Sequence, residues 1–210
     1  LGRGEEVGTD VERRLADEEA DPADDQERPP QAEQHDGRAH HEGEPTADGR
    51  TGEKFSAAFT RARDAGLRRT VHAGESSGPE GVWDALQLLH AERIDHGVRA
   101  IDDPALVEHL AQTGVPLDIC PSSNLALGLY ASASEHPVDK LSRAGVRVTI
   151  NTDDPQPIGT RLEREWALVA DTFGWDEARI VELARTSVDA SFADDDRKRD
   201  LRAAIDSHVS

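Results

Sequence analysis

A histidine and a carboxylate stand three residues apart in the segment Thr70-Val-His-Ala-Gly-Glu75. We expect the apolar segment over 67–71 to be a buried strand, with His72 at the point where this strand leaves the core. The two small residues that follow let the backbone turn tightly, so that Glu75 points back toward the same cavity. A metal ligand beside a proton-transfer group is what metal-assisted hydrolysis requires. Because His-x-x-Glu alone is a weak signal, other parts of the chain must supply partners.

Further polar clusters follow the next apolar segments, and their members are Asp95 and His96, then Ser122, Ser123 and Asn124, then Asp153 and Asp154. Strands are expected to start near 67, 93, 115 and 146, with a helical pattern after each one. Four strand–loop–helix units indicate a parallel β/α architecture. In such folds the carboxyl ends of the strands form the active-site face, and all of these polar clusters lie there.

A closed barrel of the TIM type needs eight β/α units and about 250 residues. Residues 55–210 supply four units, followed by helices expected over 161–173, 176–187 and 195–208. We therefore expect an α/β fold, an incomplete TIM-type barrel of the metal-dependent hydrolase kind with about four of eight units. Two strand edges would lack partners, and such edges favour association.

The first 54 residues have a different composition from the rest of the chain. They hold 17 acidic and 7 basic residues, no aromatic residue and few large aliphatic ones. Such a segment cannot bury enough apolar area to offset the entropy of ordering. We expect residues 1–54 to be disordered or not native to the fold, and His35, His40 and His41 to lie in a solvated tail.

The whole chain carries 43 acidic against 24 basic side chains and a net charge of −19, which argues against nucleic acid as a partner. It has no long apolar run, so we expect no membrane partner. The single Cys120 cannot form an internal disulfide, which fits a reducing compartment. A cytoplasmic protein is expected.

Four motifs in this order carry a resemblance to a known family: His-Ala-Gly-Glu, Arg-Ile-Asp-His-Gly, Cys-Pro-Ser-Ser-Asn and Asn-Thr-Asp-Asp-Pro. Together they resemble the carboxyl-terminal half of the adenosine/adenine deaminase family, from about Phe55 to Asp206. The resemblance implies a metal-dependent barrel that converts a 6-aminopurine to the 6-oxo compound and releases ammonia. A small purine nucleoside or base would be the substrate, and the oligomeric state stays open.

The resemblance also implies a role for five residues. His72 and Asp153 would be zinc ligands. Glu75 would donate a proton to the purine ring nitrogen beside the attacked carbon, and His96 would orient or deprotonate the attacking water. Asp154 would share a hydrogen bond with the imidazole part of the purine. Zinc lowers the pKa of its water to near neutrality, which makes hydroxide available at ordinary pH.

This sequence departs from the family at one important point. The family takes two further zinc ligands from a His-x-His pair on its first barrel strand, and no His-x-His occurs here. Two protein ligands are too few for a stable catalytic zinc site, so we expect this chain alone to be a poor or inactive catalyst. The alternative deaminase site, His-x-Glu with Pro-Cys-x-x-Cys, is excluded because Cys120 is the only cysteine.

Several alternatives stay open. Adenosine, converted to inosine, is the substrate expected first. Free adenine is a serious alternative because Asp95 stands where many adenosine-specific relatives carry glycine, and a larger 6-aminopurine metabolite is another. A non-catalytic remnant of the family is a further possibility. Ser122, Ser123 and Asn124 could support the site or only cap their loop. The histidines on expected helices receive no role: His90, His109, His136 and His208.

Overall fold

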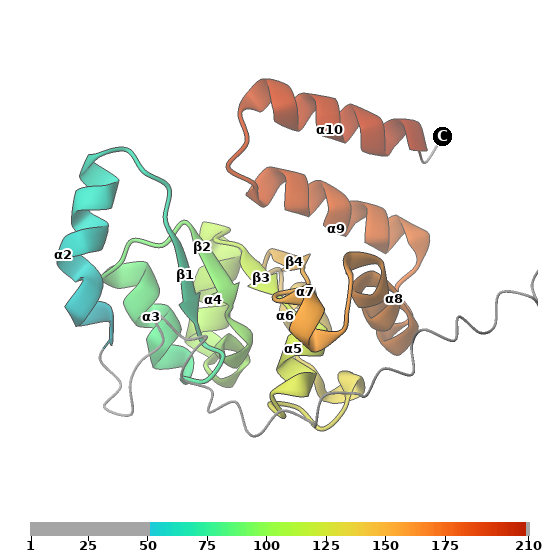
Figure 1. Cartoon of the computed structure of the whole chain (residues 1–210), viewed down its shortest axis with the longest axis horizontal. Coiled ribbons are helices and arrows are strands. Elements are labelled where there is room, and N and C mark those ends of the chain that lie inside the picture. The colour runs from blue at the N-terminus through green and yellow to red at the C-terminus, as the bar shows by residue number, and fades with distance from the viewer. Residues whose placement is uncertain (1–50, 209–210) are drawn as a thin grey trace, which may run out of the picture. The chain divides into compact units, whose positions relative to one another are not determined.

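The computed structural model describes residues 51–208. They contain a four-stranded parallel sheet in the order β1-β2-β3-β4 (Figure 1), whose strands are β1 Thr70–Ala73, β2 Arg93–His96, β3 Leu117–Ile119 and β4 Val148–Ile150. The sequential order and parallel pairing confirm the expected β/α architecture. Within the described residues, β1 and β4 each pair on one side only.

The helices alternate with the strands and then continue beyond them (Figure 1). They are α2 Thr51–Asp64, α3 Pro79–Gln87, α4 Pro104–Thr113, α5 Pro121–Ala126, α6 Val138–Arg143, α7 Pro155–Ile158, α8 Leu162–Phe173, α9 Glu177–Ala190 and α10 Asp195–His208. The last two lie side by side, and α9 also contacts β4. None of the helices in residues 51–208 is long and apolar enough to cross a membrane.

Three local expectations from the sequence were wrong. The first strand begins at Thr70 and not near 67, so His72 lies inside β1 instead of beyond its end. The segment that begins at Pro121 is a short helix and not a loop. Residues 51–54, assigned to the disordered segment, form the first turn of α2. The rest of that assignment, residues 1–50, lies outside the described part of the chain.

Prolines, aspartates and glycines set the helix boundaries as their stereochemistry requires. In α4, Pro104 occupies the first turn, and the Asp103 carboxylate accepts hydrogen bonds from the amides of Ala105 at 2.9 Å and Leu106 at 3.4 Å. These bonds satisfy amides that have no partner within the helix. Gly114 ends α4 with a left-handed φ of 70°. Such local signals made this helix predictable.

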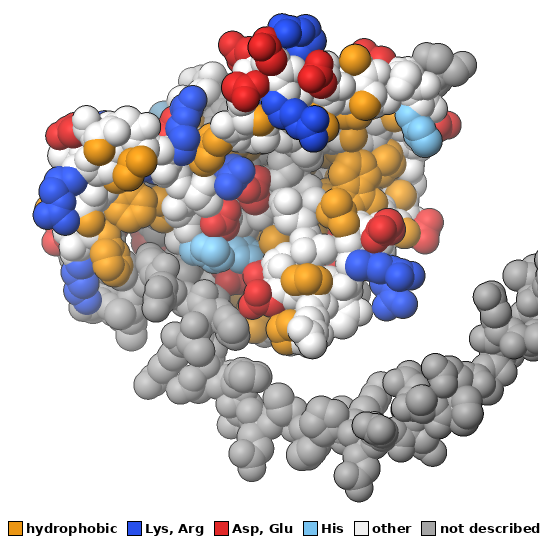
Figure 2. Space-filling model, turned by 45° about the horizontal axis from the view of Figure 1, so that its top comes forward, with side chains coloured by type: hydrophobic (Ala, Val, Ile, Leu, Met, Phe, Trp, Pro, Cys, Tyr) orange, Lys and Arg blue, Asp and Glu red, His pale blue; other side chains and the backbone are white. Residues whose placement is uncertain are grey.

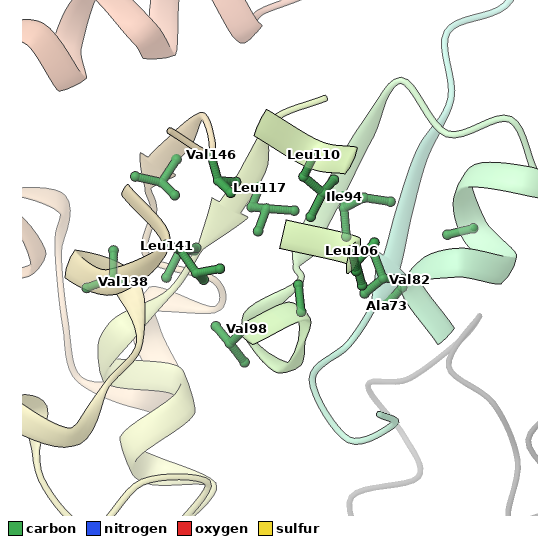
Figure 3. Packing of buried hydrophobic residues seen from close by; sticks show 14 of the residues in the cluster. Ala73, Val82, Ile94, Val98, Leu106, Leu110, Leu117, Val138, Leu141 and Val146 are labelled. Carbon is green, nitrogen blue, oxygen red and sulfur yellow. The ribbon is translucent and has the colours of Figure 1, made fainter. Parts of the chain in front are cut away.

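The two faces of the sheet differ in character. One face is apolar and packs against the helices, and Figure 3 shows this core, which includes Val82, Ile94, Leu106, Leu110, Leu117 and Leu141. The other face carries polar side chains, and its register aligns His72 with Asp95, Asp95 with Asp118, and Asp118 with Thr149. Burial of apolar area stabilises the first face. The second face supplies part of the site.

Gly74 offers a test of how tightly the turn after β1 is packed. Both Gly74 (φ 68°) and Gly66 (φ 73°) have left-handed backbone, but a Cβ on Gly74 would lie 2.4 Å from Val82 Cγ2, whereas one on Gly66 meets nothing within 4 Å. We expect Gly66→Ala to lower the free energy of unfolding by about 1–2 kcal/mol. Gly74→Ala should cost about 1–3 kcal/mol more because of the added clash. Urea unfolding of both variants measures this difference, and equal losses would contradict the close packing.

Candidate active site

The backbone at the ends of β2 and β4 adopts an unusual conformation. His96 has φ 65° and Asp153 has φ 57°, and His90 is the one other non-glycine residue with positive φ between 51 and 208. Left-handed backbone costs a non-glycine residue about 1–2 kcal/mol, and such strain collects at functional sites. The conformation brings His96 Nε2 within 3.8 Å of Asp153 Oδ2. Two of the predicted site residues therefore meet where the strands end.

His72 is paired with the neighbouring strand. Its Nδ1 lies 3.1 Å from Asp95 Oδ2, and its ring centroid lies 5.1 Å from that of His96. The hydrogen bond to Asp95 is the main reason why the pKa of His72 is raised above 6.5, although partial burial opposes the shift. Because Asp95 engages Nδ1, Nε2 is the nitrogen left for a metal, an arrangement typical of carboxylate-supported histidine ligands. The contact with Asp95 thus fixes the orientation of the His72 ring.

Glu75 and His96 form the buried centre of the site. Each side chain is only 2% exposed, and His96 Nδ1 lies 3.1 Å from Glu75 Oε1. Asn124 is fully buried beside them, and its Nδ2 donates to Glu75 Oε1 at 2.9 Å and lies 3.3 Å from His96 Nδ1. Buried carboxyl and imidazole groups require such partners. The structure therefore brings the predicted acid and the predicted base together.

Asp153 stands at the more open side of this centre. Ser123 Oγ donates to its Oδ2 at 2.6 Å, which gives Ser123 a supporting role. Within residues 51–208, the one group of three or more possible metal ligands with ligand atoms inside 4.8 Å is His96, Cys120 and Asp153. Imidazole and carboxylate are donors that zinc accepts, so His96 and Asp153 fit a zinc ion in kind. Burial raises the pKa of the Cys120 thiol and disfavours the thiolate form that would bind the metal. His72, the other expected ligand, is not in that group.

A buried glutamate holds the segment that carries Ser123 and Asn124. Glu165 of α8 has no exposed surface, and its carboxylate accepts hydrogen bonds from the Ser122 amide at 3.0 Å and from the Thr160 hydroxyl. The carboxylate thereby caps the start of α5, where amides lack partners within the helix. Glu165 could not be singled out from the sequence, because Ser122 lies 43 residues away along the chain and meets Glu165 only in the tertiary structure.

His136 is the second residue that sequence analysis missed. It is 2% exposed, and its Nε2 lies 3.0 Å from Asn124 Oδ1. Burial lowers the pKa of His136 to about 4, so the imidazole is neutral at ordinary pH. The local sequence His136-Pro137 indicates only a helix start. His136 belongs to the site because it contacts Asn124 of the Cys-Pro-Ser-Ser-Asn segment. This contact can be recognised only in the tertiary structure.

Asp154 occupies a different environment from the buried centre. It is exposed and is the residue from which α7 begins. Figure 2 shows histidine and acidic side chains gathered near the middle of one face of the molecule. The polar face of the sheet also carries Asp118. Its carboxylate accepts a hydrogen bond from Thr149 Oγ1 at 2.6 Å and forms an ion pair with Arg93 at 2.9 Å.

The geometry can be compared with known proteins. A family model described as adenosine deaminase matches residues 41–208. The chain belongs to the adenosine deaminase family. The match confirms the resemblance inferred from the motifs, and it begins earlier than Phe55. The four parallel strands of the described residues and the helices between them are β/α units of the kind from which a TIM-type barrel is built.

Three similar proteins show what this deaminase family includes. Adenine deaminase of Agrobacterium fabrum is 49% identical over 151 residues, which cover 72% of this chain and 46% of that protein. Aminodeoxyfutalosine deaminase of Streptomyces avermitilis is 48% identical over 157 residues, covering 75% and 44%. A crystal structure of an amidohydrolase from Burkholderia ambifaria with bound zinc has 32% identity and a TM-score of 0.69, covering 74% and 44%. The chain therefore spans less than half the length of these relatives.

The pair of His72 and Asp95 leads to a prediction on pKa and stability. We expect Asp95→Asn to lower the pKa of His72 toward 6.5, measured by NMR titration of the ring in the metal-free chain. Because the folded pKa is raised, the pair stabilises the fold below about pH 6.5, and this contribution is lost as pH rises through the raised pKa. Asp118→Asn, on the same sheet face, is the control. An unchanged His72 titration in Asp95→Asn would contradict the assignment.

Proposed function

We propose that this chain is part of a zinc-dependent enzyme that hydrolytically deaminates a 6-aminopurine. The observation that carries the proposal is the convergence of Glu75, His96 and Asp153, with 3.1 Å and 3.8 Å between their polar atoms. An acid, a base and a metal ligand at one place are the parts that such a hydrolysis requires. Membership of the adenosine deaminase family supports the same reaction class.

Adenine is the substrate we favour, and adenosine is the second candidate. The relative with 49% identity bears the name adenine deaminase. Asp95, which stands where many adenosine-specific members of the family carry glycine, also favours adenine. A larger 6-aminopurine metabolite stays open, since another relative is named aminodeoxyfutalosine deaminase. The residues that would contact a ribose belong largely to the half of the barrel that this chain does not span.

Each residue of the site has a part in this reaction. His72, through Nε2, and Asp153 would hold zinc, which when bound supplies a water molecule activated for attack. His96 Nε2 faces Asp153 and would orient that water and take up its proton. Glu75 would give a proton to the ring nitrogen beside the attacked carbon, so that negative charge does not build up in the ring. Asp154 would hydrogen-bond the imidazole part of the purine.

The number of ligands limits what this chain does alone. A catalytic zinc site has about three protein ligands, and the sequence contains no His-x-His pair to add to His72 and Asp153. This observation supports a second candidate, a non-catalytic remnant of the family. Zinc content separates the two when the chain is joined to the amino-terminal half of a relative that supplies the further ligands: about one ion per molecule favours the enzyme, and none favours the remnant.

The proposal is tested by comparing this chain with a hybrid protein. In the hybrid, the whole chain follows the amino-terminal half of the Agrobacterium fabrum adenine deaminase, which is 49% identical to it over the shared part. With zinc present, we expect the hybrid to release ammonia from adenine and the 210-residue chain to do so at least about 100-fold more slowly, because incomplete ligation weakens metal binding. Asp153→Ala in the hybrid is the inactive control. A folded, zinc-loaded hybrid without deaminase activity would contradict the proposal.

A further inference from the structure

A continuous line of buried hydrogen bonds connects α6 with the proposed acid. The Val138 amide lies 3.2 Å from His136 Nδ1, His136 Nε2 lies 3.0 Å from Asn124 Oδ1, and Asn124 Nδ2 lies 2.9 Å from Glu75 Oε1. His136, Asn124 and Glu75 are each 2% exposed or less. Water therefore has little access to any of these groups, and each depends on its neighbour for hydrogen bonding.

The direction of every bond in this line follows from its first donor. A backbone amide can only donate, so His136 Nδ1 must accept and carry no proton. The proton of the neutral ring is then on Nε2, which donates to Asn124 Oδ1. That bond fixes which end of the Asn124 amide is oxygen, and it leaves Nδ2 to donate to Glu75. Burial, which lowers the pKa of His136 to about 4, keeps the ring neutral.

We propose that His136 is a positioning residue for Glu75, which it holds in place through the Asn124 amide. The proposal rests on the proposed function only in calling Glu75 the proton donor. Without the His136 proton, the Asn124 amide could rotate by half a turn and present its oxygen to the Glu75 carboxylate. The carboxylate that forms when Glu75 gives up its proton would be repelled by this oxygen. A displacement of about 1 Å at a reacting group can cost about 100-fold in rate.

The simpler alternative is that His136 only stabilises the start of α6. The bond from the Val138 amide would serve that purpose, and the Tyr130 ring packs against His136 with centroids 5.0 Å apart. This alternative predicts a loss of stability on substitution, with no change at Asn124 or Glu75. The two explanations therefore differ in whether substitution of His136 changes the position of Glu75, which lies two hydrogen bonds away.

NMR on the metal-free 210-residue chain provides the first test. We expect the His136 ring to show the form protonated at Nε2 between pH 5.5 and 7.5, and one Asn124 side-chain amide proton to exchange slowly. His136→Leu should speed that exchange at least about 10-fold, because the amide loses its fixed orientation. His136→Gln, whose side-chain NH₂ can donate to Asn124 Oδ1, should restore most of the protection. A ring protonated at Nδ1, seen in the unsubstituted chain, would overturn the proposal even if His136→Leu fails to fold.

Kinetics of the hybrid protein provide the second test. There we expect His136→Leu to lower kcat about 10-fold to 100-fold with little change in KM, and His136→Gln to recover much of the loss. Adding His136→Leu to Asn124→Leu should lower kcat little further, since both act through one line of bonds. Additive losses, or equal kcat in His136→Leu and the unsubstituted hybrid, would contradict the proposal. If the hybrid proves inactive, the proposed function fails, and the NMR result still decides the role of His136.

Discussion

The buried contact between His96 and Glu75 is the constraint on which the rest of the site depends. An imidazole and a carboxyl group 3.1 Å apart, each 2% exposed, are stable only if the surrounding chain supplies their hydrogen bonds. The protein meets this requirement with tertiary contacts: Asn124 from α5 donates to Glu75, and Glu165 of α8 holds the start of α5. Left-handed backbone at His96 adds a local cost that this packing must offset. The packing of α5 and α8 at the strand ends thus stabilises the polar cluster of Glu75, His96 and Asn124.

The parallel sheet explains why residues so far apart in the sequence meet. Each strand delivers its polar residues to the same edge, because all four strands run in the same direction. His72 and Asp95 face each other directly across the β1–β2 register. Asp153 follows β4, which lies two strands away from β2, and its carboxylate still reaches His96 at the end of β2. Four strands bring together the residues that we propose as the acid, the base and part of a metal site, whereas a complete set of zinc ligands would need residues beyond this sheet.

Much of the fold was predictable because its boundaries are local. Pro104 and Gly114 delimit α4 by backbone stereochemistry alone, and the apolar run that contains Val148 predicts β4. The error at Pro121–Ala126 has a physical reason, since six residues are too few for a helical apolar pattern to emerge. His72, Glu75, His96 and Asp153 could be named from their motifs. His136 could not, because its contact with Asn124 depends on how α6 and α5 pack.

The proposed function depends on Glu75 as the proton donor to a 6-aminopurine. The most direct measurement is adenine deamination by the hybrid protein with Glu75 and with Glu75→Gln, which keeps the shape of the side chain and removes the transferable proton of the acid. The account predicts that kcat falls about 100-fold to 10,000-fold with KM nearly unchanged. A Glu75→Gln hybrid that is folded, holds zinc and retains kcat within about 3-fold would contradict it.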